Sequence, residues 1–221
     1  MNNSRHRDLA RTKARILKAA LAEFAAKGLA GARVDAIARR ARVNKRMLFY
    51  CFGSKAALYR EVLQRKLGEN LALVETAPST LSEALLRWYE AVSSDREWIR
   101  MHQWEALGGG QTLVAQDERR ELFKRALTVF RHWTKQGSLP GDVDCAQLLI
   151  SVLALTSFPV AFPQITRLIA GASPESARFR RARRGFLSWL GDRICNLEGL
   201  ASQRITACPP AALSAAQTAG R

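Results

Sequence analysis

Residues 33–55 read RVDAIARRARVNKRMLFYCFGSK, which is the pattern of two short helices joined by a tight turn. Val34 and Ile37 are apolar points of the first helix, and Leu48 and Phe52 are those of the second. Cationic residues surround these positions: Arg33, Arg39, Arg40, Arg42, Lys45, Arg46 and Lys55. A helix-turn-helix braces one helix on the DNA backbone and places the first residues of the next in the major groove. The stretch therefore predicts a DNA-binding motif.

The positive charge of the chain is concentrated around this motif. The 221 residues include 35 Lys/Arg and 19 Asp/Glu, a formal net charge of +16. Residues 1–60 hold 15 of the Lys/Arg and 3 of the Asp/Glu, a balance of +12, which leaves +4 for residues 61–221. This distribution favours a polyanionic partner, and nucleic acid in preference to an anionic membrane surface.

Cysteine usage and apolar runs exclude several other classes of protein. The four cysteines are Cys51, Cys145, Cys195 and Cys208. They form no CxxC or Cys/His cluster, so we expect no metal, no cofactor and no disulfide framework, and a reducing cytoplasm fits best. The basic N-terminus has no apolar signal segment. The apolar run 148–162 is short for a bilayer span and is interrupted by polar residues, so a buried interface helix is preferred to a membrane span.

The pattern along the chain predicts an all-α protein with about nine helices, because no strand-like alternation persists. A helix over about 8–27 and the helix pair form a three-helix head within residues 1–55, which includes a basic N-terminal arm. Residues 56–198 form a larger helical body. Its helices are expected at about 54–77, 80–93, 94–107, 113–136, 143–161 and 174–197. Residues 199–221, rich in Ala, Ser, Gln and Pro, are expected to be a disordered tail.

Several polar residues mark the expected helix starts. Ser54 is a candidate cap for the helix after the motif, and Thr80 and Ser94 each stand three residues before a glutamate, which is capping-box spacing. Ser173 precedes Pro174, so the last helix is expected to begin there. Gly28 is the expected stop of the first helix.

Three groups of residues at fixed spacing resemble the N-terminal domain of the TetR family of transcriptional regulators. They are Ile16-Leu-x-Ala-Ala-x-x-x-Phe24 with Gly28, Val34-x-x-Ile37-Ala38, and VNKRMLFYCFGSKAAL over residues 43–58. The resemblance covers roughly residues 9–60, and beyond them only the helical layout agrees.

The resemblance implies a homodimer whose two heads each place the third helix in the major groove of a two-fold symmetric operator on double-stranded DNA. The body would bind a small-molecule effector and dimerise, and effector binding would release the DNA. The chain would then be a ligand-responsive, sequence-specific repressor rather than an enzyme. The alternative is a non-specific architectural DNA-binding protein, which fits the charge but gives the nearly neutral body no purpose. The sequence shows no nucleophile paired with a base, so it gives no reason to expect an enzyme.

Carried over by position, the expected DNA-binding residues are Arg33, Val34, Asn44, Lys45, Arg46, Met47, Phe49, Tyr50 and Lys55. Lys45 and Arg46 either read guanine edges or contact phosphate without reading sequence. Tyr50 is either a groove contact or an exposed aromatic residue. Arg33, Val34 and Lys55 match positions that hold the DNA backbone. The arm over residues 5–11 either orders on DNA or is a disordered tail.

The motif departs from the family pattern at four places. Arg42 replaces the turn glycine, which best tolerates positive φ. Phe49 replaces a common tyrosine, and Cys51 replaces a histidine or aromatic residue and is either a redox switch or an inert helix residue. Ala32 and Arg33 stand where a capping Ser or Thr is usual. We hypothesise that the extra cations Arg33 and Arg42 compensate by contacting phosphate.

The effector and dimer residues are expected from the apolar pattern of the body. The expected cavity residues are Trp98, His102, Trp104, Glu105, Phe130, Trp133, Phe158 and Phe162. Alternatively, the aromatic residues are ordinary members of the hydrophobic core, and His102 and Glu105 lie on the surface. The helix over 143–161 is apolar almost all round, and the last helix has one apolar face, which suits a two-fold bundle. The expected dimer residues are Leu149, Val152, Leu153, Phe186, Leu187, Leu190 and Ile194.

Overall fold

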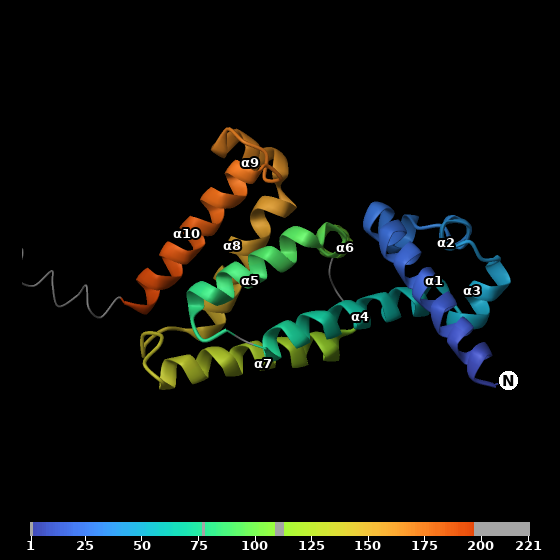
Figure 1. The fold of residues 1–221 in the computed structure, drawn as a ribbon, viewed down its shortest axis with the longest axis horizontal. Helices are drawn as coiled ribbons and strands as arrows, with labels where there is room; N and C mark the ends of the chain where they lie inside the picture. Colours follow the sequence, from blue (N-terminus) through green and yellow to red (C-terminus); the bar gives the residue numbers. More distant parts are fainter. Residues whose placement is uncertain (1, 77, 109–112, 197–221) are drawn as a thin grey trace, which may run out of the picture.

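The computed structural model describes residues 2–76, 78–108 and 113–196, and over these ranges the chain folds into ten helices without strands (Figure 1). The helices are α1 (Asn2–Gly31), α2 (Val34–Ala41), α3 (Lys45–Phe52), α4 (Lys55–Glu75), α5 (Leu81–Ser94), α6 (Arg96–Leu107), α7 (Gln116–Lys135), α8 (Cys145–Ala161), α9 (Pro163–Ala170) and α10 (Ala177–Cys195). The predicted all-α class is confirmed. The expected tail over 199–221 lies outside the described residues.

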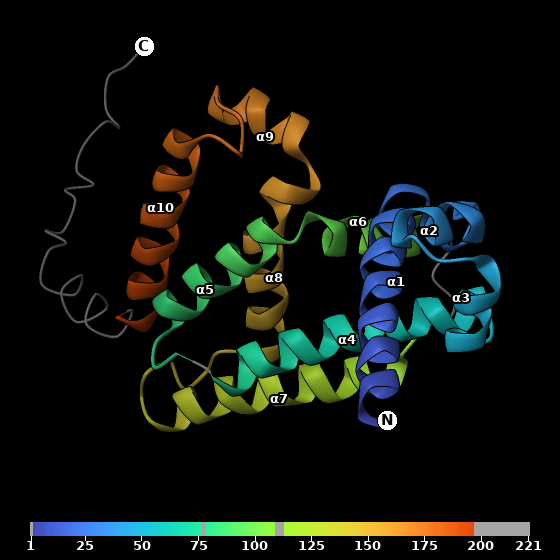
Figure 2. The same ribbon diagram turned by 45° about the vertical axis from the view of Figure 1, so that its right-hand side comes forward.

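The first three helices gather at one end of the molecule and α10 lies at the other (Figures 1 and 2). Ile16, Phe24, Ile37 and Leu48 are fully buried and form the core of this head. The head is small, so α4 completes its core through its first turns before it continues into the body. α1 begins at Asn2 rather than near residue 8, so the N-terminal arm is helical.

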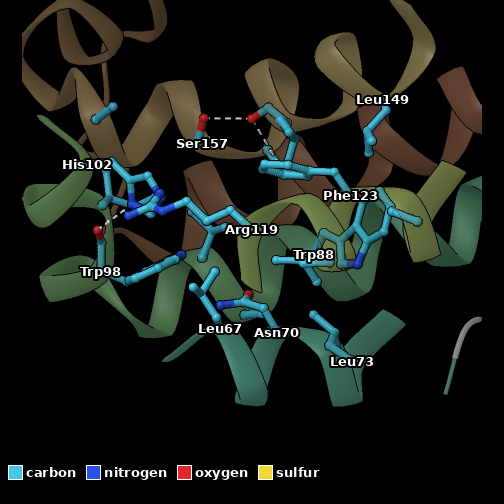
Figure 3. A pocket seen from close by; sticks show the side chains of 18 of the residues that line it. Leu67, Asn70, Leu73, Trp88, Trp98, His102, Arg119, Phe123, Leu149 and Ser157 are labelled. Atoms are coloured by element: carbon cyan, nitrogen blue, oxygen red, sulfur yellow. Dashed lines mark hydrogen bonds between the residues drawn. The ribbon is translucent and has the colours of Figure 1, made fainter. Parts of the chain in front are cut away.

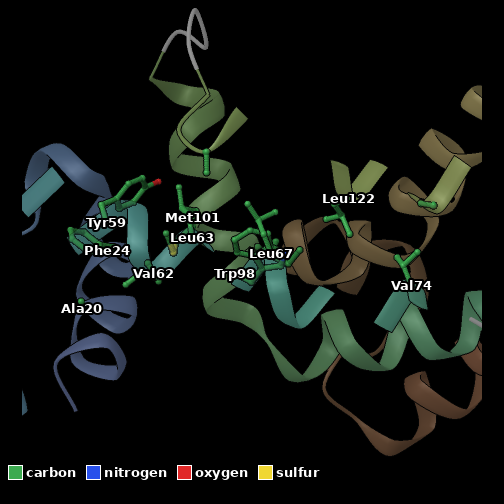
Figure 4. Close-up of a cluster of buried hydrophobic side chains, with 14 of the residues drawn as sticks. Ala20, Phe24, Tyr59, Val62, Leu63, Leu67, Val74, Trp98, Met101 and Leu122 are labelled. Atoms are coloured by element: carbon green, nitrogen blue, oxygen red, sulfur yellow. The ribbon is translucent and has the colours of Figure 1, made fainter. Parts of the chain in front are cut away.

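The core of the head continues into the body along α4, as Figure 4 shows. The ring of Phe24 in α1 meets the ring of Tyr59 in α4 edge to face, with centroids 4.9 Å apart. Val62 and Leu63 follow one turn later on α4, and Met101 of α6 is buried beside them. One contiguous set of buried side chains therefore joins the three-helix head to the body.

Two of the predicted helix caps are wrong, Ser94 and Ser173. Thr80 caps α5 as expected, since its hydroxyl accepts the backbone N–H of Glu83 at 3.2 Å. α5 then runs through Ser94, and Asp95 caps α6 by accepting from Trp98 N at 3.1 Å. The last helix begins after Ser176, whose hydroxyl accepts from Phe179 N at 3.2 Å, and not after Ser173. Each region offers more than one capping residue, and tertiary packing decides which one is used.

The helix α9 was not predicted, and it accounts for the tenth helix. α8 ends at Ala161, and Pro163 starts α9 at its first position, where the missing N–H leaves no hydrogen bond unmade. No single helix in the described ranges is long and apolar enough to cross a membrane. α8 and α9 reach the required length and composition only together, and they are bent by 90° where they meet.

One face of α10 packs closely on α5 inside the protomer. A Cβ at Gly191 would lie 2.5 Å from the Cα of Ser82, so only glycine permits this approach. The hydroxyls of Ser82 and Ser188 are 3.0 Å apart, and Leu187 is fully buried beside them. This face of α10 is therefore unavailable to a partner.

Candidate DNA-binding surface and effector cavity

Local interactions fix the start of α3, the helix expected to enter DNA. Arg42 takes a left-handed conformation (φ 54°, ψ 49°) at the end of α2, which turns the chain without a glycine. The side chain of Asn44 then accepts the backbone N–H of Met47 at 2.7 Å and caps α3. Asn44 thus has a structural role at the point nearest the expected contact with DNA.

The outer face of α3 exposes apolar side chains that the fold does not use. Met47, Phe49 and Tyr50 are 37%, 39% and 76% exposed, whereas Leu48 and Phe52 of the same helix are buried in the head. Three neighbouring exposed apolar residues on one short helix indicate a surface that a partner covers. Thymine methyl groups and deoxyribose in a groove offer such a partner.

Some cations of the motif have partners within the protein, and others have no partner among the described residues. Lys45 forms an ion pair with Asp35 of α2 at 3.0 Å. Lys55 donates to the carbonyls of Ala30 and Ala32, each at 3.2 Å, and so holds the end of α1. Arg33 and Arg46 are exposed, which leaves them available to phosphate or base edges. The positive residues thus both build the head and give its outer face a positive potential.

A buried carboxylate replaces the helix cap that α2 lacks. Arg33 provides no side-chain cap, but its backbone N–H donates to Oε1 of Glu23 in α1 at 3.2 Å. Lys27 donates to the same oxygen at 2.9 Å. Burial alone would raise the pKa of Glu23, but these two hydrogen bonds hold it below its ordinary value. Sequence reasoning missed Glu23, because its partner lies ten residues away.

Cys51 lies on α3 beside Met47, with the two sulfur atoms 4.0 Å apart. Burial raises the pKa of the Cys51 thiol. A raised pKa keeps the thiol protonated, which disfavours a redox switch at this position.

The body contains a cavity of about 380 Å³ lined by residues of α4, α5, α6, α7 and α8 (Figure 3). Its walls are mainly aliphatic and aromatic. The aromatic lining comes from Trp88, Trp98, Phe123 and Phe162. The polar lining residues are Asn70, His102, Gln103, Arg119, Thr156 and Ser157. A cavity of this size and composition suits a small, mostly apolar molecule.

One wall of the cavity carries a buried polar cluster centred on Arg119. The guanidinium donates to both carboxylate oxygens of Glu105 at 2.9 and 2.8 Å, to Val114 O at 3.1 Å and toward His102 Nε2 at 3.3 Å. The other ring nitrogen of His102 faces the carbonyl of Trp98 at 2.9 Å. This donor arrangement requires a neutral His102 with the proton on Nδ1.

The cluster continues toward the head through Tyr59. Burial raises the pKa of this hydroxyl, and the neighbouring Glu105 carboxylate raises it further. Tyr59 in turn contacts Phe24 of α1. A chain of contacts therefore leads from the cavity wall to the core of the DNA-binding head.

Three of the eight expected cavity residues line this cavity: Trp98, His102 and Phe162. Glu105 stands behind Arg119, and the indole N–H of Trp104 donates to Ala25 O of α1. The other three lie elsewhere. Phe130 and Trp133 are stacked in the core with centroids 5.4 Å apart, and Phe158 lies in an outer groove beside α9 and α10. Those five residues do not line this cavity; apolar periodicity identifies a buried face but cannot separate cavity wall from solid core.

The lining residues that sequence reasoning missed include Trp88, Phe123 and Arg119. Trp88 and Phe123 lie on helices with ordinary apolar faces, so nothing in the pattern distinguished them. Arg119 lies in the charged run QDERRE over residues 116–121, which reads as a solvated surface. Only its distant partner Glu105 explains why this arginine is buried.

The expected dimer residues also divide in the structure. Leu149, Val152 and Leu187 are buried within the protomer, where they belong to its own core. Leu153 and Phe186 are exposed, and Leu190 and Ile194 are partly buried. Because α8 is apolar on all sides, its sequence cannot show which side faces the protomer's own core. The exposed apolar residues of α8, α9 and α10 are Ile150, Leu153, Phe158, Ile165, Leu168, Ile169, Phe186 and Trp189.

Two family models match the chain and together cover both parts of the fold. Residues 16–62 match the model described as bacterial regulatory proteins of the tetR family. Residues 81–186 match the model of the tetracyclin repressor-like C-terminal domain. The first match contains α2 and α3, and the second contains most of the cavity wall.

Full-length relatives agree with these matches. The chain is 32% identical over 166 residues to the transcriptional repressor SCO4008 of Streptomyces coelicolor, covering 75% of this chain and 86% of the relative. It is 30% identical over 177 residues to the transcriptional regulator RutR of Escherichia coli, covering 76% and 83%.

Solved structures share the fold. The transcriptional regulator SCO4942 of Streptomyces coelicolor superposes with a TM-score of 0.68 at 25% identity, covering 81% of this chain and 97% of that one. Salmonella enterica GusR superposes with a TM-score of 0.59 at 19% identity, covering 82% and 95%. Family models match both parts of the chain, and a helix-turn-helix repressor is related to it over 75% of its residues. The chain therefore belongs to the TetR family of bacterial transcriptional regulators.

Proposed function

We propose that this chain is a ligand-responsive, sequence-specific repressor that binds a two-fold symmetric operator as a homodimer and leaves it when a small molecule fills the cavity. The observation that carries the proposal is that the same two helices, α4 and α6, line the cavity and contact the DNA-binding head. A ligand that moves α4 or α6 therefore also moves residues that pack against the head and hold α3 in place.

The proposed DNA contacts follow from the exposed face of α3. Arg46 stands near the N-terminus of this helix, where a side chain reaches base edges, and it can donate to guanine O6 and N7. Met47, Phe49 and Tyr50 supply apolar contacts, and Lys45 and Lys55 add positive charge. Arg33 and Val34 begin α2 and are positioned to hold the DNA backbone.

The proposed response passes through α6. His102 and Gln103 line the cavity, and the next two residues face the head side: Trp104 reaches α1, and Glu105 lies by Tyr59. A ligand that shifts the cavity face of α6 also shifts these head contacts. In a dimer, a small rotation of each head changes the distance between the two recognition helices and lowers operator affinity.

The proposed dimer surface is the exposed apolar side of α8, α9 and α10. Leu168 and Ile169 are 81% and 77% exposed, and Phe186 and Trp189 are exposed on the neighbouring α10. Exposed apolar side chains gathered on neighbouring helices are characteristic of a protein–protein interface. A two-fold axis through it would bring two heads to one face of the DNA.

The experiment that tests the proposal is selection of binding sites from random duplex DNA by the purified full-length chain at near-physiological salt. Recovery of a two-fold symmetric site with half-sites about one helical turn apart supports a dimeric sequence-specific regulator. Tight binding without an enriched sequence would favour the architectural alternative, and recovery of no DNA would overturn the proposal.

A further inference from the structure

We propose that the effector cavity takes an uncharged, largely aromatic molecule that carries a hydrogen-bond donor, and that it rejects carboxylates. The inference rests on the proposed function for its regulatory meaning. Binding itself requires no DNA, so it can be tested separately. The argument uses the charge, the hydrogen-bond capacity and the shape of the lining.

The cavity wall is electrically balanced before any ligand enters. Arg119 is the one charged side chain among the described residues that line it, and the Glu105 carboxylate pairs with it bidentately. Both side chains are buried, with 6% and 12% of their surface exposed. An anionic ligand would have to displace Glu105 and leave a buried carboxylate unpaired, which is strongly unfavourable.

Many of the remaining donors of the polar wall are also engaged. Nε of Arg119 donates to Val114 O, and Nη1 is bonded to the neutral His102. The hydroxyl of Thr156 donates to Val152 O at 2.8 Å, and that of Ser157 donates to Leu153 O at 2.6 Å. These bonds are made within the protein, so the two hydroxyl protons and most of the guanidinium N–H groups are not available to a carboxylate.

Acceptor capacity is left over on the amide and hydroxyl groups. The amide of Asn70 donates to Lys66 O at 2.8 Å, and that of Gln103 donates to Ala161 O at 2.7 Å. Each bond uses one of the two N–H groups of the amide, and within the described residues no donor reaches the two amide oxygens. The hydroxyl oxygens of Thr156 and Ser157 keep lone pairs as well. A ligand N–H or O–H group can donate to these oxygens.

The shape of the lining favours rings. Trp88 and Phe123 stand on one side of the cavity and Trp98 on another (Figure 3). Aromatic walls bind flat molecules by offset stacking or edge contact. A cation would also be attracted to these ring faces, but no carboxylate among the described lining residues would balance its charge once it is desolvated.

The test compares four probes on one fused-ring skeleton by isothermal titration calorimetry with the wild-type full-length protein. The probes are 2-naphthalenemethanol, 2-(methoxymethyl)naphthalene, 2-naphthoate and 2-naphthylmethylammonium. The alcohol has a donor, the ether has none, and the other two carry opposite charges. We expect the alcohol to bind with a Kd about tenfold or more below those of the two ions, and below that of the ether.

A charge change at the cavity wall should alter the selectivity in a defined direction. Glu105→Gln removes the balancing charge of Arg119, so we expect the affinity for 2-naphthoate to rise about tenfold or more, with little change for the alcohol. The matched control is Glu97→Gln, which removes the same charge from the exposed side of α6. It should leave all four affinities unchanged.

The outcomes are distinguishable from those of the operator experiment. If 2-naphthoate or the ammonium probe binds the wild type as tightly as the alcohol, or if no probe binds, the inference is overturned. Either result leaves operator recognition untouched, because that is measured without these compounds. The wild-type series also decides the inference if Glu105→Gln fails to fold.

Discussion

The indole N–H of Trp104 in α6 donates to the backbone carbonyl of Ala25 in α1 at 3.1 Å, so a helix of the body is hydrogen-bonded to a helix of the head. The same ring lies against Gly28, where a Cβ would be 3.1 Å from it. Gly28 has φ 66° and ψ 176°, a conformation that essentially only glycine adopts. The junction between head and body therefore depends on one glycine and one tryptophan.

Gly28→Ala should destabilise the protein by about 2 kcal/mol or more, because the backbone conformation becomes strained and the new methyl group meets the ring of Trp104. Urea unfolding followed by circular dichroism measures this change. Gly68→Ala is the control, since Gly68 lies within α4 with open space around its Cβ position. It should raise stability by about 0.5–1 kcal/mol. Equal effects of the two substitutions would contradict the role assigned to Gly28.

Arg42→Gly should have opposite effects on stability and on DNA binding. Glycine accepts the left-handed conformation of this residue without strain, so the free energy of unfolding should rise by about 1 kcal/mol. If Arg42 contacts phosphate, the slope of log affinity against log salt should become shallower by about 0.9. Arg42→Ala is the matched variant, since it loses the charge and keeps the strain. An unchanged salt slope in both variants would remove Arg42 from the DNA-binding surface.

Asp35→Asn should strengthen operator binding and barely change stability. Asp35 and Lys45 are both more than half exposed, and such ion pairs contribute less than about 1 kcal/mol. Releasing Lys45 adds a cation at the DNA-facing end of α3 and removes a negative charge beside it. Fluorescence anisotropy with the selected operator should show tighter binding. The slope of log affinity against log salt should become steeper by about 0.9, which corresponds to one more phosphate contact. Asp117→Asn, in the body, removes the same charge and should change neither.

The sequence of the head predicts its structure well, because short-range chemistry determines it. Asn44 and Ser54 cap the helices that follow them, and the apolar spacing of Ile37, Leu48 and Phe52 identifies the buried faces. Glu23 is the exception. It caps a helix from ten residues upstream, and no local pattern indicates such a contact.

The body is less predictable, because the same composition builds cavity wall, solid core and outer surface. Trp98 and Phe130 are both aromatic residues on amphipathic helices, yet the first lines the cavity and the second is packed in the core. Arg119 lies in a charged run and becomes buried only because Glu105 faces it from another helix. Periodicity identifies the buried side of an amphipathic helix but not that of α8, and only the packing of five helices determines where space remains.

His102 should make stability depend on pH near neutrality. Burial lowers the pKa of His102 from its ordinary value of 6.5, and the Arg119 guanidinium beside it lowers the pKa further. The neutral ring is therefore favoured in the folded state. The folded pKa lies below the unfolded one, so this contribution to stability is complete above about pH 6.5 and is lost as the pH falls through the folded pKa.

The measurement is the free energy of unfolding of the wild type and of His102→Gln between pH values of about 7.5 and about 5.5. The wild type should lose more stability than the variant over this range, because glutamine does not titrate. His132→Gln, at an exposed position on α7, should follow the wild type. A wild-type profile that runs parallel to that of His102→Gln would mean that the Arg119 cluster tolerates a protonated ring. His102 would then not be the neutral acceptor that the balanced charge of the cavity wall requires.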